Sequence, residues 1–195
     1  MLALHIKNHH RTAVCVHHFY KALLCYLFGD YQQAEQEAQA CQQDLSSIGA
    51  TYTSGWIHFI AALTQLALIP SSSVLQHPSR FRKVKSLLNK LQHWAKHCPI
   101  NQQHRILLVQ AEIARVQKRY HSAMELFEQA IVSANQSEVP MDRALAYELA
   151  ARLYHNWHKP VIAETYLRSA LKLYRQWGAS AKVDHLIQQH QLQEP

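Results

Sequence analysis

Apolar residues recur at three- and four-residue steps along most of the chain, a spacing that places them on one face of an α-helix. The stretch 79–97 shows this most clearly, because its apolar residues alternate with charged and polar ones. Isolated glycines and prolines separate the periodic stretches from one another. The pattern predicts helices at 13–28, 31–47, 52–69, 79–97, 101–118, 120–135, 140–156, 160–177 and 180–191.

Three residues predict helix ends by their chemistry. The hydroxyl of Ser79 suits the position that caps the start of the helix 79–97. Pro160 has the fixed φ of a first helical turn, and Gly178 suits the left-handed residue that follows a helix. The sequence therefore places helix boundaries at these three positions.

The stretch from Arg105 to Gly178 contains two copies of one helix pair, offset by 40 residues (111→151, 123→163). Self-similarity at such a period is typical of stacked helical hairpins, in which small residues allow close packing. The sequence therefore predicts an all-α, right-handed solenoid of about four hairpins, closed by 180–191 as a C-terminal capping helix. The matching pairs are Ala111 with Ala151, Tyr120 with Pro160, Ala123 with Ala163, Phe127 with Leu167, and Ala130 with Ala170.

The N-terminal part is less regular. Residues 1–12 have no clear period, so we expect a frayed leader followed by one repeat domain at 13–195. The helix 13–28 is apolar on nearly every face, and such a helix needs cover on both sides. We expect an upstream helix of a longer parent, a partner chain or a second copy of this chain to cover it.

Composition supports this class of fold. The 195 residues are 48% hydrophobic with 4 glycines and 6 prolines, which fits a helical domain with a real core. The four cysteines show no Cys-x-x-Cys spacing, no secretory signal is evident, and 56–69 is too short to cross a bilayer. We expect a cytoplasmic protein with reduced cysteines and no membrane contact.

Five segments stand out in this order along the chain: Tyr20–Ala34, His93–His104, Ala111–Met124, Ala144–Arg152 and Trp177–Val183. Together they resemble the tetratricopeptide-like helical region of large bacterial multidomain signalling proteins. In that family a serine/threonine kinase and a P-loop ATPase domain precede the helical region, and GAF and histidine-kinase domains often follow it. This chain has Lys118 and His158 in turns where the family often has glycine, and we expect it to be a stand-alone or truncated piece of such a protein.

Motifs for catalysis are missing from the sequence. Its four glycines are isolated, so no P-loop, kinase glycine loop or nucleophile elbow is present. His93 and His97, near Cys98 and His104, have a spacing that can hold a metal, but 15 histidines are spread throughout the chain. We expect no enzyme activity, no cofactor and no native metal site.

A basic helix offers a different function. Six cations lie between Arg80 and Lys96, and the net charge is +7. Such a helix can follow nucleic-acid phosphates, although its aromatic residues fall on the apolar face rather than among the charges. A solvated face, or one that meets an acidic partner, is the other reading of these charges.

The first helices of the two regular hairpins carry charged residues that tetratricopeptide geometry would place in a concave groove. Arginine suits recognition of a carboxylate or phosphorylated segment. The alternative is that Glu112 with Arg115, and Glu148 with Arg152, pair within their own helices. The candidate partner-binding residues are Arg105, Glu112, Arg115, Glu148, Arg152 and His155.

These features predict a non-catalytic scaffold for protein–protein contact. The resemblance implies a place in bacterial signal transduction, between an ATPase module and downstream sensor modules, so the partner would be a kinase, ATPase or sensor protein. Two alternatives remain: a nucleic-acid-binding helical protein that uses 80–96, and a kinase or ATPase label inherited from a multidomain parent without its catalytic domains. Failure to bind ATP in a thermal-shift assay would confirm that such a label does not belong to this polypeptide.

Overall fold

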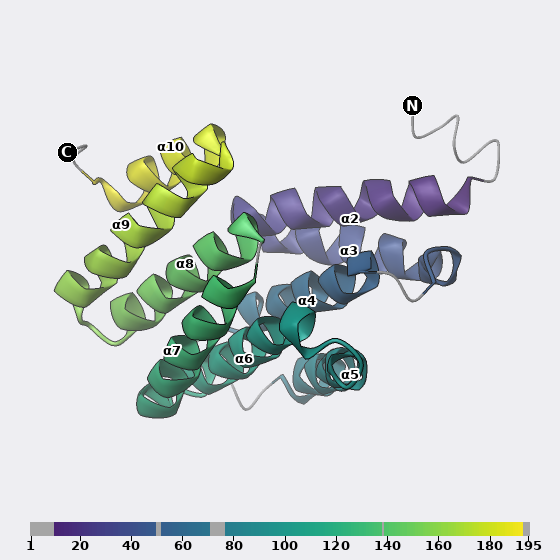
Figure 1. Cartoon of the computed structure of the whole chain (residues 1–195), viewed down its shortest axis with the longest axis horizontal. Coiled ribbons are helices and arrows are strands. Elements are labelled where there is room, and N and C mark those ends of the chain that lie inside the picture. Colours follow the sequence, from purple (N-terminus) through teal and green to yellow (C-terminus); the bar gives the residue numbers. More distant parts are fainter. Residues whose placement is uncertain (1–9, 50–51, 71–76, 138, 193–195) are drawn as a thin grey trace. The chain divides into compact units, whose positions relative to one another are not determined.

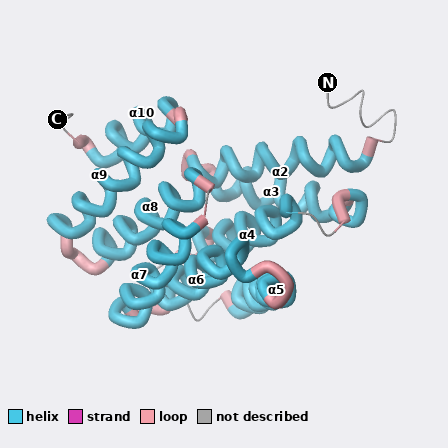
Figure 2. The backbone as a smooth tube through the Cα atoms, in the orientation of Figure 1, coloured by secondary structure: helices cyan, strands magenta, loops and turns pink. Residues whose placement is uncertain are grey.

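A computed structural model describes residues 10–49, 52–70, 77–137 and 139–192. Within these ranges the chain is all-helical and contains no strand (Figure 2). It divides into two compact units, Met1–His97 and Cys98–Pro195, where the sequence predicts one repeat domain. The predicted leader lies largely outside the described residues, but the first described helix already begins at Arg11.

The first unit pairs its helices in chain order. Helices α2 and α3 pack side by side as a hairpin (Figure 1), α3 also packs on α4, and α4 pairs with α5. Helix α4 is buried on nearly every face from Ser54 to Leu66, as its predominantly apolar sequence requires. The elements are α2 (Arg11–Leu27), α3 (Tyr31–Gln43), the 3₁₀ helix η1 (Leu45–Ser47), α4 (Tyr52–Ala67) and α5 (Pro78–Ala95).

The second unit contains the two regular hairpins, α6 with α7 and α8 with α9, followed by α10 against α9. The alanines that define the 40-residue offset are buried in both copies, as are Phe127 and its counterpart Leu167. Small buried side chains let neighbouring helices approach closely, which explains why alanine recurs there. The helices are α6 (Pro99–Val116), α7 (Tyr120–Gln136), α8 (Pro140–Asn156), α9 (Pro160–Trp177) and α10 (Ser180–His190).

Four inter-helix turns share one backbone geometry. The residues Gly29, Lys118, His158 and Gly178 all have φ between 57° and 86°, in the left-handed region. In each turn the amide of the following residue donates to the carbonyl five residues before it, as Arg119 does to Ala114 at 2.9 Å. This is the Schellman end of a helix, and it lets each chain segment reverse into the next helix.

The predicted helix boundaries lie within two residues of the observed ones except at the end of 31–47, and one predicted cap is wrong. Pro160 begins α9 and Gly178 ends it, which confirms both predictions. Ser79 is not the cap of α5: Pro78 occupies the first helical position and His77 precedes it, because proline suits a position whose amide has no helical partner. The predicted helix 31–47 stops at Gln43, and η1 follows as an extra element that the sequence did not predict.

Candidate functional site

The six predicted groove residues lie on α6 and α8 of the second unit. Four of them are buried, namely Arg105, Glu112, Arg115 and Glu148. Arg152 is partly exposed and His155 is exposed, so only these two present substantial side-chain surface to solvent. The structure therefore divides the predicted set into an internal group of four and a surface pair.

Arg105 is fully buried and pairs with Asp142, a residue at the start of α8 that the sequence did not single out. Its Nε and Nη2 donate to Oδ2 of Asp142 at 3.1 and 2.9 Å, and Nε2 of His104 lies 2.7 Å from the same oxygen. A buried charge is stable only when it is paired, so this contact fixes α6 to α8. The sequence did contain one sign that Asp142 has a structural role, because it is an acidic residue in the first turn of a predicted helix.

Glu112 and Arg115 form the intrahelical pair that the alternative interpretation predicts. Nε and Nη2 of Arg115 donate to the two carboxylate oxygens of Glu112 at 2.7 and 2.8 Å. Both side chains are buried or nearly so. This bidentate pairing engages both carboxylate oxygens of Glu112 within its own helix.

Glu148 joins three helices of the second unit. It accepts hydrogen bonds from the Tyr174 hydroxyl on α9 at 2.7 Å and from Nζ of Lys182 on α10 at 2.9 Å. Arg152 lies farther away, at 3.9 Å. Burial lowers the pKa of Lys182 and the Glu148 charge opposes that shift, so the two groups stabilise each other inside the unit. The positions of Tyr174 and Lys182 in the sequence do not predict their contacts with Glu148, because these contacts join separate helices.

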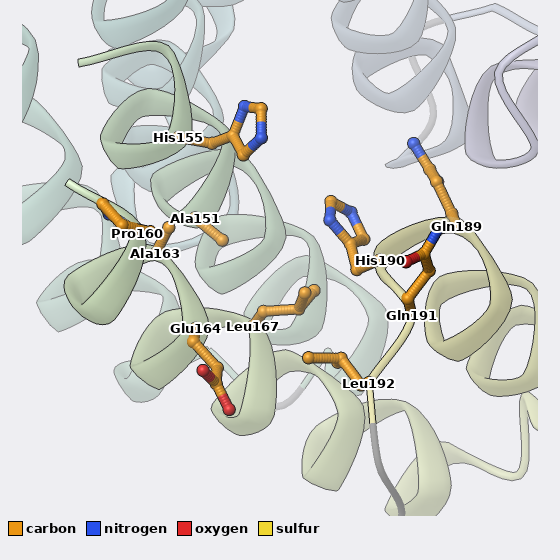
Figure 3. Close-up of a pocket in the computed structure, with 10 residues that line it drawn as sticks. All are labelled: Ala151, His155, Pro160, Ala163, Glu164, Leu167, Gln189, His190, Gln191 and Leu192. Atoms are coloured by element: carbon orange, nitrogen blue, oxygen red, sulfur yellow. The ribbon is translucent and has the colours of Figure 1, made fainter. Parts of the chain in front are cut away.

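A pocket of about 310 Å³ opens between α8, α9 and the end of α10. Figure 3 shows the rings of His155 and His190 on opposite sides of it, while Leu167 and Leu192 extend toward each other below. The two ring centroids are 6.4 Å apart. An apolar floor with a few polar groups at the rim is the usual composition of a binding pocket, and this volume is at the small end of the range.

His190 favours the neutral form in this pocket. Burial lowers its pKa, and the nearby His155 adds to the effect. A neutral imidazole has one nitrogen that donates and one that accepts, so the rim can pair with a backbone amide or an uncharged polar side chain. The chemistry of the pocket thus fits an apolar side chain with adjacent polar groups.

One cation of the basic helix α5, Arg80, makes contacts inside the first unit. Nη1 of Arg80 donates to Glu35 on α3 at 3.0 Å and to Gln65 on α4 at 2.8 Å. Burial raises the pKa of Glu35, but the hydrogen bonds from Arg80 and Gln65 outweigh it and lower the pKa. The cations that remain exposed are Arg82, Lys83, Lys85, Lys90 and Lys96.

The histidines do not converge on a metal centre in the described ranges. The rings of His93 on α5 and of His97, just beyond the end of α5, lie edge to face with their centroids 6.0 Å apart, whereas His104 is buried and paired with Asp142. No group of three or more histidine, cysteine or acidic residues in that part of the chain has the geometry to hold a metal ion.

A row of exposed apolar side chains lies along α2. This helix buries Phe19, Leu23 and Leu27 on one side, but it leaves Tyr20, Leu24 and Phe28 exposed by 56%, 54% and 38%. The three exposed residues are four apart, so they form one stripe along the helix, called the α2 stripe below. The sequence predicted an unusually apolar helix here, and the structure identifies which face remains uncovered.

No helix in the described ranges combines the length and apolar character that a bilayer crossing requires.

Comparison with other proteins adds no family assignment. No protein-family model matches the sequence, and no curated protein matches it significantly.

Proposed function

We propose that this chain is a non-catalytic helical scaffold for protein–protein contact, built as a tetratricopeptide-like right-handed solenoid of hairpins. The resemblance of its five segments to the helical region of bacterial signalling proteins supports a role beside kinase, ATPase or sensor modules. The repeated hairpins of the second unit and their shared turns also support the repeat interpretation. It would act by docking partner proteins or by relaying conformational changes between them, without catalysing a reaction.

The α2 stripe is the observation that carries this proposal. Large apolar side chains at i, i+4 and i+8 form the face that an amphipathic helix uses to meet another helix. A contiguous apolar strip that faces solvent is typical of an interaction site. Leu24 lies at its centre, with Tyr20 and Phe28 one turn on either side. A second copy of this chain supplies a matching stripe, which makes self-association through α2 the contact to test first.

Molar mass in solution tests this contact. We expect wild-type mass to rise with concentration from 22.5 kDa toward twice that value, and Leu24→Lys to remain at one chain because it places a charge on the stripe. Val161→Lys is the matched control, since Val161 is 78% exposed on α9 and belongs to the other unit of the chain. Light scattering after gel filtration gives the mass directly.

A different protein can also occupy the stripe, and selection of displayed helical peptides tests that case. Peptides retained by wild type and by Val161→Lys, but not by Leu24→Lys, would support a heterologous partner. A constant one-chain mass together with no such peptide would contradict the scaffold proposal. Circular dichroism of both variants would verify that the exposed substitutions leave the helices intact.

The pocket between α8, α9 and α10 is a second place for a partner to bind. It contains His155 of the predicted groove, and Arg152 lies one turn earlier on the same helix. An extended segment could place an apolar side chain over Leu167 and its polar groups beside the imidazoles. A displayed-peptide selection on wild type and His155→Ala, which changes an exposed residue of the pocket, would separate pocket binders from stripe binders.

Nucleic-acid binding is the second candidate, favoured by the four exposed cations of α5 and by Lys96 at its C-terminal cap. A phosphate-tracking helix predicts weak binding that falls steeply with salt. A gel shift that disappears at moderate salt and weakens with Lys85→Glu would support it. The absence of any shift at low salt would dismiss it.

A further inference from the structure

Two cysteines of the first unit face each other inside the α2–α3 hairpin. Cys15 on α2 and Cys41 on α3 are both fully buried, and their Sγ atoms are 3.1 Å apart. The Cys15 thiol also donates a hydrogen bond to the backbone oxygen of Cys41 at 3.1 Å. The other two cysteines differ, because Cys25 is half-buried and Cys98 is exposed.

The hairpin holds the two sulfurs near bonding geometry. A disulfide bond is about 2.0 Å long, so the sulfurs need to approach by only about 1 Å. Both thiols are on consecutive helices that pack along their length, and the turn at Gly29 fixes their register. Rotation of the two side chains can supply this movement while the helices keep their places.

We propose that Cys15 and Cys41 form a reversible disulfide when the protein meets a peroxide. The thiolate of one cysteine attacks a peroxide oxygen, the O–O bond breaks, and the departing hydroxide takes the thiol proton to form water. The second sulfur then attacks the resulting sulfenic acid, the S–O bond breaks, and a second water leaves with the second proton. Two thiols thus lose two electrons and the peroxide gains them.

The environment of the pair sets the conditions for this reaction. Burial raises the pKa of both thiols, and the neighbouring Cys15 raises that of Cys41 further. Little thiolate is therefore present at neutral pH, and oxidation should accelerate as the pH rises. A small oxidant such as hydrogen peroxide reaches a buried pair more readily than a bulky disulfide, which makes it the appropriate reagent.

The bond would cross-link the two helices of the hairpin that carries the α2 stripe. It would join two positions 26 residues apart in the sequence and so restrict the unfolded chain. A rise in the thermal midpoint of roughly 5–10 °C is expected on oxidation, reversed by dithiothreitol. This inference does not depend on the proposed scaffold function, because it concerns the chemistry of the hairpin alone.

The test treats the native full-length chain with hydrogen peroxide at neutral pH and at about pH 8.5, near the ordinary thiol pKa. After alkylation of free thiols, trypsin cuts after Lys21 and a glutamyl protease cuts after Glu37, so Cys15, Cys25 and Cys41 fall on separate peptides. We expect a Cys15–Cys41 cross-linked pair lighter by two hydrogens, formed faster at the higher pH. The thermal midpoint should rise with it.

Two variants make the assignment specific. A Cys25→Ser/Cys98→Ser double variant should keep the cross-link and the midpoint shift, whereas Cys41→Ala should lose both. Three results would overturn the proposal: cross-links that join other cysteines, sulfenic or sulfinic acid at Cys15 or Cys41 without a bond between them, or a bond that appears only in denatured protein. Peptide mapping of wild type is decisive even if a variant folds poorly.

Discussion

At the scale of single residues, two turns hold side chains where glycine is the usual choice. Lys118 and His158 both have φ of 57°, at matching places in the two hairpins of the second unit. The same turn in the first unit has Gly29. A residue with a Cβ is strained in the left-handed region, whereas glycine is not.

Replacement of these residues by glycine should therefore stabilise the protein. We expect Lys118→Gly and His158→Gly each to raise the free energy of unfolding by about 0.5–1 kcal/mol, measured by urea denaturation. Lys172→Gly, at an exposed position inside α9, is the control and should lower stability by about 1 kcal/mol. A loss of stability in both turn variants would contradict the turn geometry.

The buried charge of Arg105 predicts a large effect at Asp142. Removal of the carboxylate in Asp142→Ala leaves the guanidinium buried with its charge uncompensated, at a cost of about 3–5 kcal/mol. Urea denaturation measures the loss. Glu164→Ala is the matched control, because Glu164 is about half exposed in its pair with Arg168 and should cost less than about 1 kcal/mol. Equal effects in the two variants would contradict the burial of this pair.

Glu37 makes the first unit sensitive to acid. Burial raises the pKa of Glu37, but hydrogen bonds from Lys21, His18 and Gln33 outweigh it and lower that pKa from 4.5 to about 2. A lowered carboxyl pKa adds stability that is present above pH 4.5 and is lost as the pH falls toward 2. We expect Glu37→Gln to lose about 1–2 kcal/mol at neutral pH and less in acid.

Urea midpoints measured across this pH range check that prediction. Wild type and Glu37→Gln should converge as the pH falls, because the carboxylate that distinguishes them becomes protonated. Gln33→Ala serves as the control, since it removes one donor and keeps the charge of Glu37. Parallel curves at all pH values would contradict the proposed role of the carboxylate.

At the scale of helices, close packing depends on alanines at repeated positions. Ala123 on α7 is fully buried, so Ala123→Leu should overpack the α6–α7 hairpin and cost about 1–3 kcal/mol. Ser122→Leu adds the same side chain at the neighbouring exposed position and should change stability little. Thermal denaturation followed by circular dichroism distinguishes the two, and equal midpoints would contradict the repeat assignment there.

The helices themselves were the most predictable level of the structure. The three- and four-residue spacing predicted α9 to the residue, because Pro160 and Gly178 define its ends by backbone chemistry. The start of α5 was less predictable, since Pro78 and Ser79 are adjacent and both suit a helix start. The break after Gln43 was missed, because the residues that follow it continue the apolar spacing through Leu45.

At the scale of the whole molecule, the described chain forms two compact units that differ in character. The first contains the exposed α2 stripe and the Cys15–Cys41 pair, and the second contains the regular hairpins and the α8–α9–α10 pocket. Of the two surfaces proposed to meet a partner, the α2 stripe thus lies outside the regular hairpins, whereas the pocket is built on one of them.

The candidate site could be predicted only in part from the sequence. Helical spacing placed Arg105 and Glu148 on the first helices of their hairpins, which was enough to nominate them. It did not reveal that Asp142 and Lys182 would meet them, because these contacts join separate helices. Of the nominated residues, His155 borders a pocket whose other wall is the end of α10.

The sequence by itself determined the helices, their turns and the repeat, because these follow from local spacing and from glycine and proline chemistry. The tertiary structure alone decided which charges are internal and which apolar face of α2 stays exposed. It also decided that Cys15 lies beside Cys41, 26 residues away. Such contacts depend on how helices pack against one another, and side-chain periodicity along one helix carries no information about the neighbour it will meet.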